Sequence, residues 1–175
     1  HSVILSKFNV DVTRRHLCTL MPQTWLTDEV VNFTMSMLQE RDDLLCAREG
    51  AEMSHSTSYR RPSHFFNSFF VDRLQDSGLN QKYCYNNVRR WTRKFDIFSQ
   101  DKVFCPVNIN NMHWALAVMF MQERKIVYYD SMGGSDGGLL DKLLRYLDDE
   151  SQDKLKHSLH AKTSWVMRRS SLYET

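Results

Sequence analysis

The segment from Trp114 to Met121, WALAVMFM, constrains the fold most, because its side chains are apolar at odd and even positions alike. A strand with two apolar faces has to be covered on both sides, which is typical of the centre of a sheet. After the polar stretch 122–125, the run from Ile126 to Asp130 has the composition of a second strand. The two runs predict an antiparallel hairpin inside a sheet.

Helices are expected on either side of this hairpin. Apolar residues recur at helical spacing over 24–40, 65–74 and 139–147, and more weakly over 80–93. A short apolar run at 103–107 contains Pro106, which predicts a strand end or a bulge. The polar segment 42–62 contains Gly50 and predicts a surface loop. Together these elements predict an α+β domain.

Size and composition limit the function classes. The chain has 175 residues, a size typical of one domain, and a formal charge of +2, which argues against nucleic acid as the main partner. It lacks the run of about 18 apolar residues that a membrane-spanning helix needs. The four cysteines, Cys18, Cys46, Cys84 and Cys105, form no C-x-x-C pair, which argues against a zinc or redox motif. We expect reduced thiols, with two disulfides as the alternative.

Three further motifs have ordinary structural explanations. The glycine-rich loop 133–138 is followed by two leucines instead of Lys-Ser or Lys-Thr, so it predicts a connection and no phosphate site. The basic run 88–94 could touch nucleic acid or an acidic protein, but a helix with Trp91 in the core is favoured. His157 and His160 lack the acidic or cysteine neighbours of a metal site, and no metal is expected.

His113 and Asp130 are the candidate catalytic residues. His113 opens one strand of the hairpin and Asp130 ends the other, so the fold brings these two ends together. A turn centred on 122–125 places Asp130 opposite residue 116 or 117 and diagonal to His113. A carboxylate beside an imidazole fixes its tautomer, as nucleophilic catalysis requires. The alternative is a hydrogen-bonded strand-end histidine and an unrelated turn aspartate.

Five motifs, in order along the chain, resemble the SUMO-specific (sentrin/Ulp-type) cysteine proteases. The first, WLTDEVVNF at 25–33, is similar to the W-L-x-D-E-x-I-N-F signature of that family. The others are HFFNSFF at 64–70, RWT at 90–92, the segment 107–114 that ends in His-Trp, and YYDSM at 128–132.

The resemblance implies a papain-like α+β fold of the Ulp type, a central mixed sheet flanked by helices, and cleavage after the Gly-Gly terminus of a ubiquitin-like modifier. His113 would be the general base and Asp130 the residue that orients it. Trp25 and Trp114 would enclose the Gly-Gly tail, and Asp28 and Phe66 would contact the body of the modifier. The implied protein is a nuclear or otherwise intracellular monomer without cofactor, metal, nucleic-acid or membrane partner. It acts on SUMO, or a related modifier, and its conjugates.

The family's catalytic cysteine and oxyanion glutamine lie in a P-Q-Q-x-N-x-x-D-C-G motif that this sequence does not contain. None of its four cysteines has that context, and Cys105 reads as a core residue. We therefore expect residues 1–175 to be a single catalytic domain without its C-terminal part, inactive alone. A modifier-binding pseudoprotease and a deneddylase of the same family are the alternatives.

Overall fold

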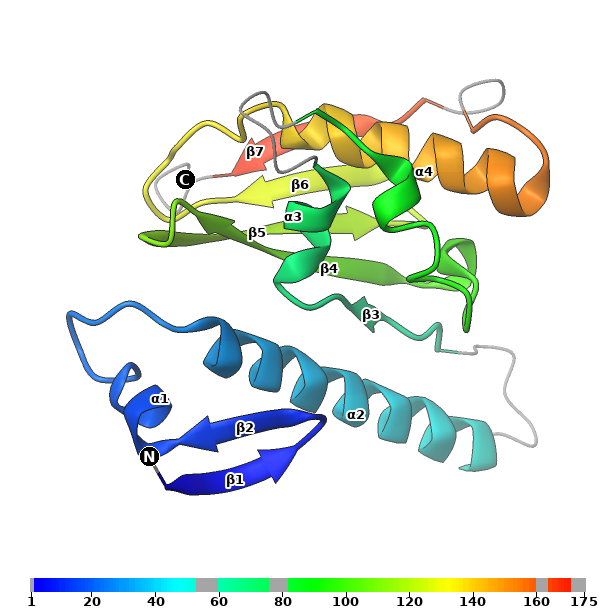
Figure 1. Cartoon of the computed structure of the whole chain (residues 1–175). Helices are drawn as coiled ribbons and strands as arrows, with labels where there is room; N and C mark the ends of the chain where they lie inside the picture. The colour runs from blue at the N-terminus through cyan, green and yellow to red at the C-terminus, as the bar shows by residue number, and fades with distance from the viewer. Residues whose placement is uncertain (1, 53–59, 76–81, 160–163, 171–175) are drawn as a thin grey trace.

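The computed structural model describes residues 2–52, 60–75, 82–159 and 164–170, and contains a five-stranded mixed sheet and a two-stranded one (Figure 1). The large sheet has the order β3-β4-β5-β6-β7. Its strands are β3 (His64–Phe65), β4 (Lys102–Ile109), β5 (His113–Phe120), β6 (Lys125–Tyr129) and β7 (Val166–Ser170). The small sheet pairs β1 (Val3–Lys7) with β2 (Val10–Thr13).

The predicted hairpin forms the middle of the large sheet. β5 pairs antiparallel with β4 and with β6, while β3 and β7 add in parallel at the two edges. One face of β5, carrying Ala115, Ala117 and Met119, is buried in the core. The opposite face is half-buried apart from Val118. The predicted α+β fold with a mixed sheet is confirmed.

Helices α3 (Phe69–Leu74) and α4 (Leu139–Leu155) lie together on the core face of the sheet (Figure 1). The ring of Phe70 in α3 meets the ring of Tyr146 in α4 edge-on, with centroids 5.1 Å apart. The leucines that predicted a helix at 139–147 do form one, because they repeat on a single buried stripe. The helix continues to Leu155, eight residues beyond the predicted end.

A second layer consists of α2 (Asp28–Glu52), the β1–β2 hairpin and the short helix α1 (Arg14–Cys18) (Figure 1). Side-chain hydrogen bonds join α2 to β3. The amide of Gln39 accepts from the backbone N–H of Phe65 at 2.9 Å and donates to the carbonyl of Ser63 at 3.1 Å.

Three predictions of local structure are wrong. Residues 42–52, predicted as part of a loop, are helical. The buried carboxylate of Asp42 accepts a hydrogen bond from the Ser63 backbone N–H and forms an ion pair with Arg60, and these contacts tie this part of α2 to the rest of the fold. Phe65 belongs to a strand, and the helix predicted at 65–74 begins only at Phe69. Of the segment predicted as a helix at 80–93, the described residues 82–93 contain only a short 3₁₀ helix, Tyr85–Asn87, followed by turns.

Pro106 lies inside β4 and not at a strand end. The N–H of Phe66 donates to the carbonyl of Phe104, so alternate residues of β4, including Pro106, direct their backbone polar groups toward β3. Pairing with β3 covers only Val103 and Phe104. The missing N–H of proline therefore falls where β4 has no strand beside it among the described residues.

Candidate active site

His113 and Asp130 meet at one end of the central hairpin. His113 is the first residue of β5, and Asp130 directly follows the last residue of β6. The imidazole Nε2 lies 2.6 Å from the Asp130 Oδ1, and both side chains are largely buried, at 14% and 4% exposure. The two residues that the sequence singled out are in direct contact.

The register of this hairpin differs from the prediction by about one residue. Tyr129 pairs with Leu116, so Asp130 continues opposite Ala115, not opposite 116 or 117. The turn ends at Arg124, which has a positive φ of 51°, and Lys125 already belongs to β6. The Lys125 ammonium lies over the Phe120 ring, 4.5 Å from its centroid, which favours this pairing. Asp130 and His113 remain diagonal neighbours, as expected.

The carboxylate of Asp130 sits on the loop that follows it. Its Oδ1 accepts from the backbone N–H of Met132 at 2.8 Å, and its Oδ2 from the N–H of Gly134 at 3.1 Å. Burial acts to raise the pKa of Asp130, but the hydrogen bonds from Met132, His113 and Gly134 outweigh it and hold the pKa below its usual range. Asp130 is therefore ionised and able to bond the imidazole.

Two tryptophans lie beside this pair. Trp25 is 57% exposed, and its ring stands edge-on to the His113 ring at a centroid distance of 6.2 Å. Trp114, the next residue of β5, donates its indole N–H to the carbonyl of Leu26 at 2.9 Å. This bond joins the segment before α2 to the sheet at the position of His113. The structure thus places Trp25 against the imidazole and the Trp114 indole against the segment that follows Trp25.

The two predicted contacts to the modifier body differ in exposure. Asp28 is the first residue of α2, and its carboxylate accepts from the hydroxyl of Ser68 at 3.3 Å. Phe66 is only 2% exposed and stacks on Phe70 in the core, at a ring distance of 3.8 Å. The expectation that Phe66 meets a partner is therefore wrong. Phe69, three residues later, is 47% exposed and is the aromatic side chain of this motif that faces outward.

None of the four cysteines contacts His113. All four are free thiols, in line with the expected reduced state. Cys105 pairs with Ala117, four residues along the sheet from the His113 position, which corresponds to roughly 13 Å. Burial raises the pKa of the Cys105 thiol strongly, and burial together with Asp42 raises that of Cys46. These thiols are disfavoured as nucleophiles.

The described ranges contain neither a candidate metal cluster nor a candidate membrane span. No group of three or more His, Cys, Asp or Glu side chains there could hold a metal ion. His157 contacts the hydroxyl of Ser151 at 3.3 Å, and His160 lies outside the described residues. None of the described helices is both long and apolar enough to cross a bilayer.

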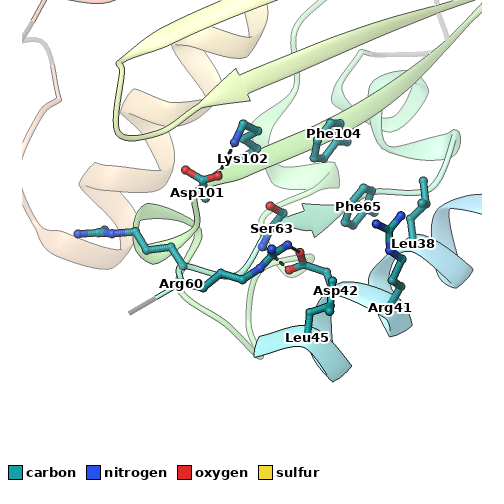
Figure 2. Close-up of a pocket in the computed structure, with 11 residues that line it drawn as sticks. Leu38, Arg41, Asp42, Leu45, Arg60, Ser63, Phe65, Asp101, Lys102 and Phe104 are labelled. Carbon is teal, nitrogen blue, oxygen red and sulfur yellow. Dashed lines mark hydrogen bonds and ion pairs between the residues drawn. The ribbon is translucent and has the colours of Figure 1, made fainter. Parts of the chain in front are cut away.

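A separate cavity of about 610 Å³ lies between α2 and the beginning of β4 (Figure 2). Its walls include the stacked rings of Phe65 and Phe104 and the ion pair between Arg60 and Asp42. Among the described residues that line it there is no histidine or cysteine.

Comparison with known sequences places the chain in one family. Residues 24–172 match the Ulp1 protease family, C-terminal catalytic domain. The chain is 39% identical over 150 residues to ubiquitin-like-specific protease 1A of Arabidopsis thaliana, and 34% identical over 162 residues to a sentrin-specific protease of Caenorhabditis elegans. These matches cover 83% and 93% of this chain but only 27% and 20% of the relatives. The chain thus spans about a quarter of their length.

Solved structures agree with the sequence matches. The chain is similar to the SUMO protease Ulp1 with its catalytic cysteine oxidised to a sulfinic acid, with a TM-score of 0.69 and 28% identity over 94% of this chain and 64% of that one. It is also similar to the C-terminal Ulp1 protease domain in complex with Smt3, the yeast ortholog of SUMO, with a TM-score of 0.68 and 27% identity, covering 97% of this chain and 66% of that one. With a paired histidine and aspartate at the end of this sheet, the chain belongs to the Ulp1 protease family.

Proposed function

We propose that this domain supplies the base, the orienting acid and the modifier-binding surface of a SUMO-specific cysteine protease. Such an enzyme processes SUMO precursors after Gly-Gly and removes SUMO from conjugated proteins. The observation that carries the proposal is the 2.6 Å contact between His113 and Asp130, with Trp25 and Trp114 beside it. The similarity to an Ulp1 domain in complex with Smt3 supports SUMO as the modifier.

Separate roles are proposed for the two imidazole nitrogens of His113. Because Nε2 faces the Asp130 carboxylate, the proton belongs on Nε2 and the lone pair on Nδ1. Nδ1 takes the proton of the nucleophilic thiol, and the thiolate attacks the carbonyl carbon of the terminal glycine. As the C–N bond breaks, the imidazolium returns the proton to the leaving amine. Water then attacks the thioester, giving up its proton to Nδ1, and the free thiol is restored.

The nucleophile is proposed to lie outside the 175 residues. Cys18 is at the end of α1, Cys46 is within α2, and Cys105 is enclosed in the core. No described contact joins any of the four cysteines to His113, and acyl transfer needs the thiol within hydrogen-bond reach of the base. A further segment of the protein has to bring the thiol and the oxyanion donor to this end of the sheet.

The modifier tail is proposed to pass between Trp25 and Trp114. Two indole walls admit only residues without side chains, which selects Gly-Gly. Asp28 and the exposed Phe69, which takes the place of the buried Phe66, are proposed to bind the body of the modifier. We further propose that the protein acts as a monomer inside the cell, in the nucleus, at the nuclear envelope or in the cytoplasm.

The test is cleavage by the full-length protein of purified precursors of SUMO and of a second ubiquitin-like modifier, before and after treatment with a thiol alkylator. We expect cleavage of the SUMO precursor that the alkylator abolishes. Binding without cleavage identifies a pseudoprotease. Preference for the second modifier, chosen as the one that deneddylases remove, identifies a deneddylase. Either result rejects the proposed activity.

A further inference from the structure

The loop between β6 and α4, residues 131–138, holds the Asp130 carboxylate in place. Two of the three hydrogen bonds to this carboxylate come from the loop backbone, at Met132 and Gly134. A Cβ atom added to Gly134 would lie 2.6 Å from Oδ2, so the carboxylate packs directly on the loop. Any shift of the loop therefore moves the group that orients His113.

Besides its bonds to the Asp130 carboxylate, the loop has two local hydrogen bonds: the N–H of Gly133 donates to the Asp130 carbonyl at 3.1 Å, and that of Gly137 to the Ser135 hydroxyl at 3.3 Å. Gly133, Gly137 and Gly138 all have positive φ angles, a conformation that glycine adopts readily. Gly138 is the N-cap residue of α4 and has no side chain to cap the helix. Contacts from outside the loop therefore contribute to its position.

Asp136 fastens the far end of the loop to α4. Its Oδ2 accepts from the backbone N–H of Leu140 at 3.2 Å, and its carbonyl accepts from the N–H of Leu139 at 2.9 Å. Its side chain is only 3% exposed. A carboxylate removed from water in this way needs a cation beside it to remain charged.

Arg169 of β7 is that cation. Its Nε lies 2.5 Å from the Asp136 Oδ1, while 63% of the arginine side chain remains exposed. The next residue of β7, Ser170, accepts at its carbonyl a hydrogen bond of 3.3 Å from the Asp130 N–H. β7 therefore holds the loop at both of its ends, and Figure 1 shows this strand beside β6, where the loop begins.

We propose that Arg169 is a positioning residue for catalysis: by pairing with Asp136 it fixes the loop on which the Asp130 carboxylate rests. The inference rests on the proposed function for its kinetic consequence. The described partner of the Arg169 side chain is Asp136, and no described contact joins Arg169 to His113. Its effect passes through the loop, in keeping with the need of a catalytic pair for a rigid support.

The test compares Arg169→Ala with Arg168→Ala in the full-length protein. Arg168 is the neighbouring exposed arginine of the same strand, and no ion pair joins it to any residue that the structure describes. With a SUMO precursor as substrate, we expect kcat to fall at least tenfold in Arg169→Ala while KM stays within twofold. Arg168→Ala should leave both constants within twofold of the wild type.

A second substitution separates positioning from general stability. In Arg169→Ala/Asp136→Asn the buried charge is gone, while the amide oxygen still accepts from Leu140. Because the tie to β7 is still absent, we expect kcat to stay about as low as in Arg169→Ala; a return to within threefold of the wild type would assign the loss to the unpaired charge and overturn the positioning role. If Arg169→Ala does not fold, Arg169→Met replaces it, because methionine keeps the aliphatic part of the side chain without its charge or its donors.

Hydrogen exchange of the peptide covering residues 130–138 gives a readout that does not depend on activity. We expect exchange at least tenfold faster in Arg169→Ala and unchanged in Arg168→Ala. Equal exchange and equal kcat in the two variants would overturn the positioning role. A wild-type protein that cleaves no precursor contradicts the proposed function instead, and the exchange result still decides the role of Arg169.

Discussion

Asp130 carries the sharpest functional prediction at the scale of single residues. Replacing its carboxylate with an amide keeps the size of the side chain but allows the amide to donate to Nε2, which favours the wrong imidazole tautomer. We expect Asp130→Asn in the full-length protein to lower kcat roughly 10³-fold or more. Binding of SUMO, measured by calorimetry, should change little. Unchanged turnover would remove Asp130 from the mechanism.

Trp114 combines an aromatic wall with a hydrogen bond. Trp114→Ala removes both. We expect the transition-state stabilisation, measured from kcat/KM for Gly-Gly substrates, to fall by about 2–4 kcal/mol, as for other large buried aromatic contacts. Trp114→Phe retains a ring and loses the hydrogen bond to the Leu26 carbonyl, so its kcat/KM should lie between those of the wild type and Trp114→Ala. Steady-state kinetics on one precursor ranks the three proteins. Equal rates in the wild type and Trp114→Ala would exclude Trp114 as an aromatic wall that binds the Gly-Gly tail.

The sequence identifies residues well where a local pattern determines their surroundings. His113 and Asp130 were found because each stands at the end of a strand that its own neighbours define. Phe66 and Phe69 show the limit of such inference. Both are aromatic and three residues apart, and only packing against Phe70 decides that the first is buried and the second exposed.

Among the elements, α2 depends most on a distant partner. Asp42, 6% exposed at its side chain, accepts from the Ser63 N–H at 2.7 Å and pairs with Arg60. Asp42→Ala leaves the Ser63 N–H without an acceptor, and we expect a loss of about 2–3 kcal/mol in the free energy of unfolding. Asp43→Ala is the control, because Asp43 is exposed and, within the described part of the chain, accepts only from Gln39. Urea denaturation distinguishes them, and equal midpoints would contradict this role.

The two strands β1 and β7, which the sequence missed, carry no recognisable pattern of their own. All residues of β1 are exposed, and β7 is exposed except for half-buried Ser170, so neither has an apolar alternation to recognise. β7 is a strand because it adds in parallel to β6, about forty residues earlier in the chain. The central hairpin, whose strands are joined by a short turn, needed no such information.

For the whole molecule, His64 predicts how stability depends on pH. Burial between aromatic rings lowers its pKa from 6.5 to about 4, so the folded state holds the neutral form. Below pH 6.5 the unfolded chain binds a proton that the folded chain does not, and stability falls until about pH 4. The loss is about 3–4 kcal/mol. Asp130, whose pKa is lowered, adds a further loss only as the pH falls below 3.8.

His64→Phe tests this assignment. Phenylalanine keeps the stacking on Phe95, whose ring centroid lies 4.1 Å away, and cannot be protonated. We expect the decrease in stability between pH 6.5 and 4 to become shallower by the same amount, as measured by urea denaturation at several pH values. An identical pH profile in the variant would show that other groups cause the loss.

The 175 residues by themselves are predicted to have no peptidase activity, because none of their cysteines reaches His113. The measurement is incubation of the isolated chain with a SUMO precursor and with a SUMO-based electrophilic probe. We expect neither turnover nor covalent labelling. Labelling of Cys18, Cys46, Cys84 or Cys105 would mean that the nucleophile is one of these four.

The position of Pro106 has a consequence for association between molecules. A strand with free N–H groups at the border of a sheet invites a strand from another chain to pair with it, which is a common route to aggregation. Beyond Phe104, β4 has no described strand beside it, and Pro106 removes the donor that an incoming strand would need there. The border of the sheet thus resists strand addition close to His113 and Asp130.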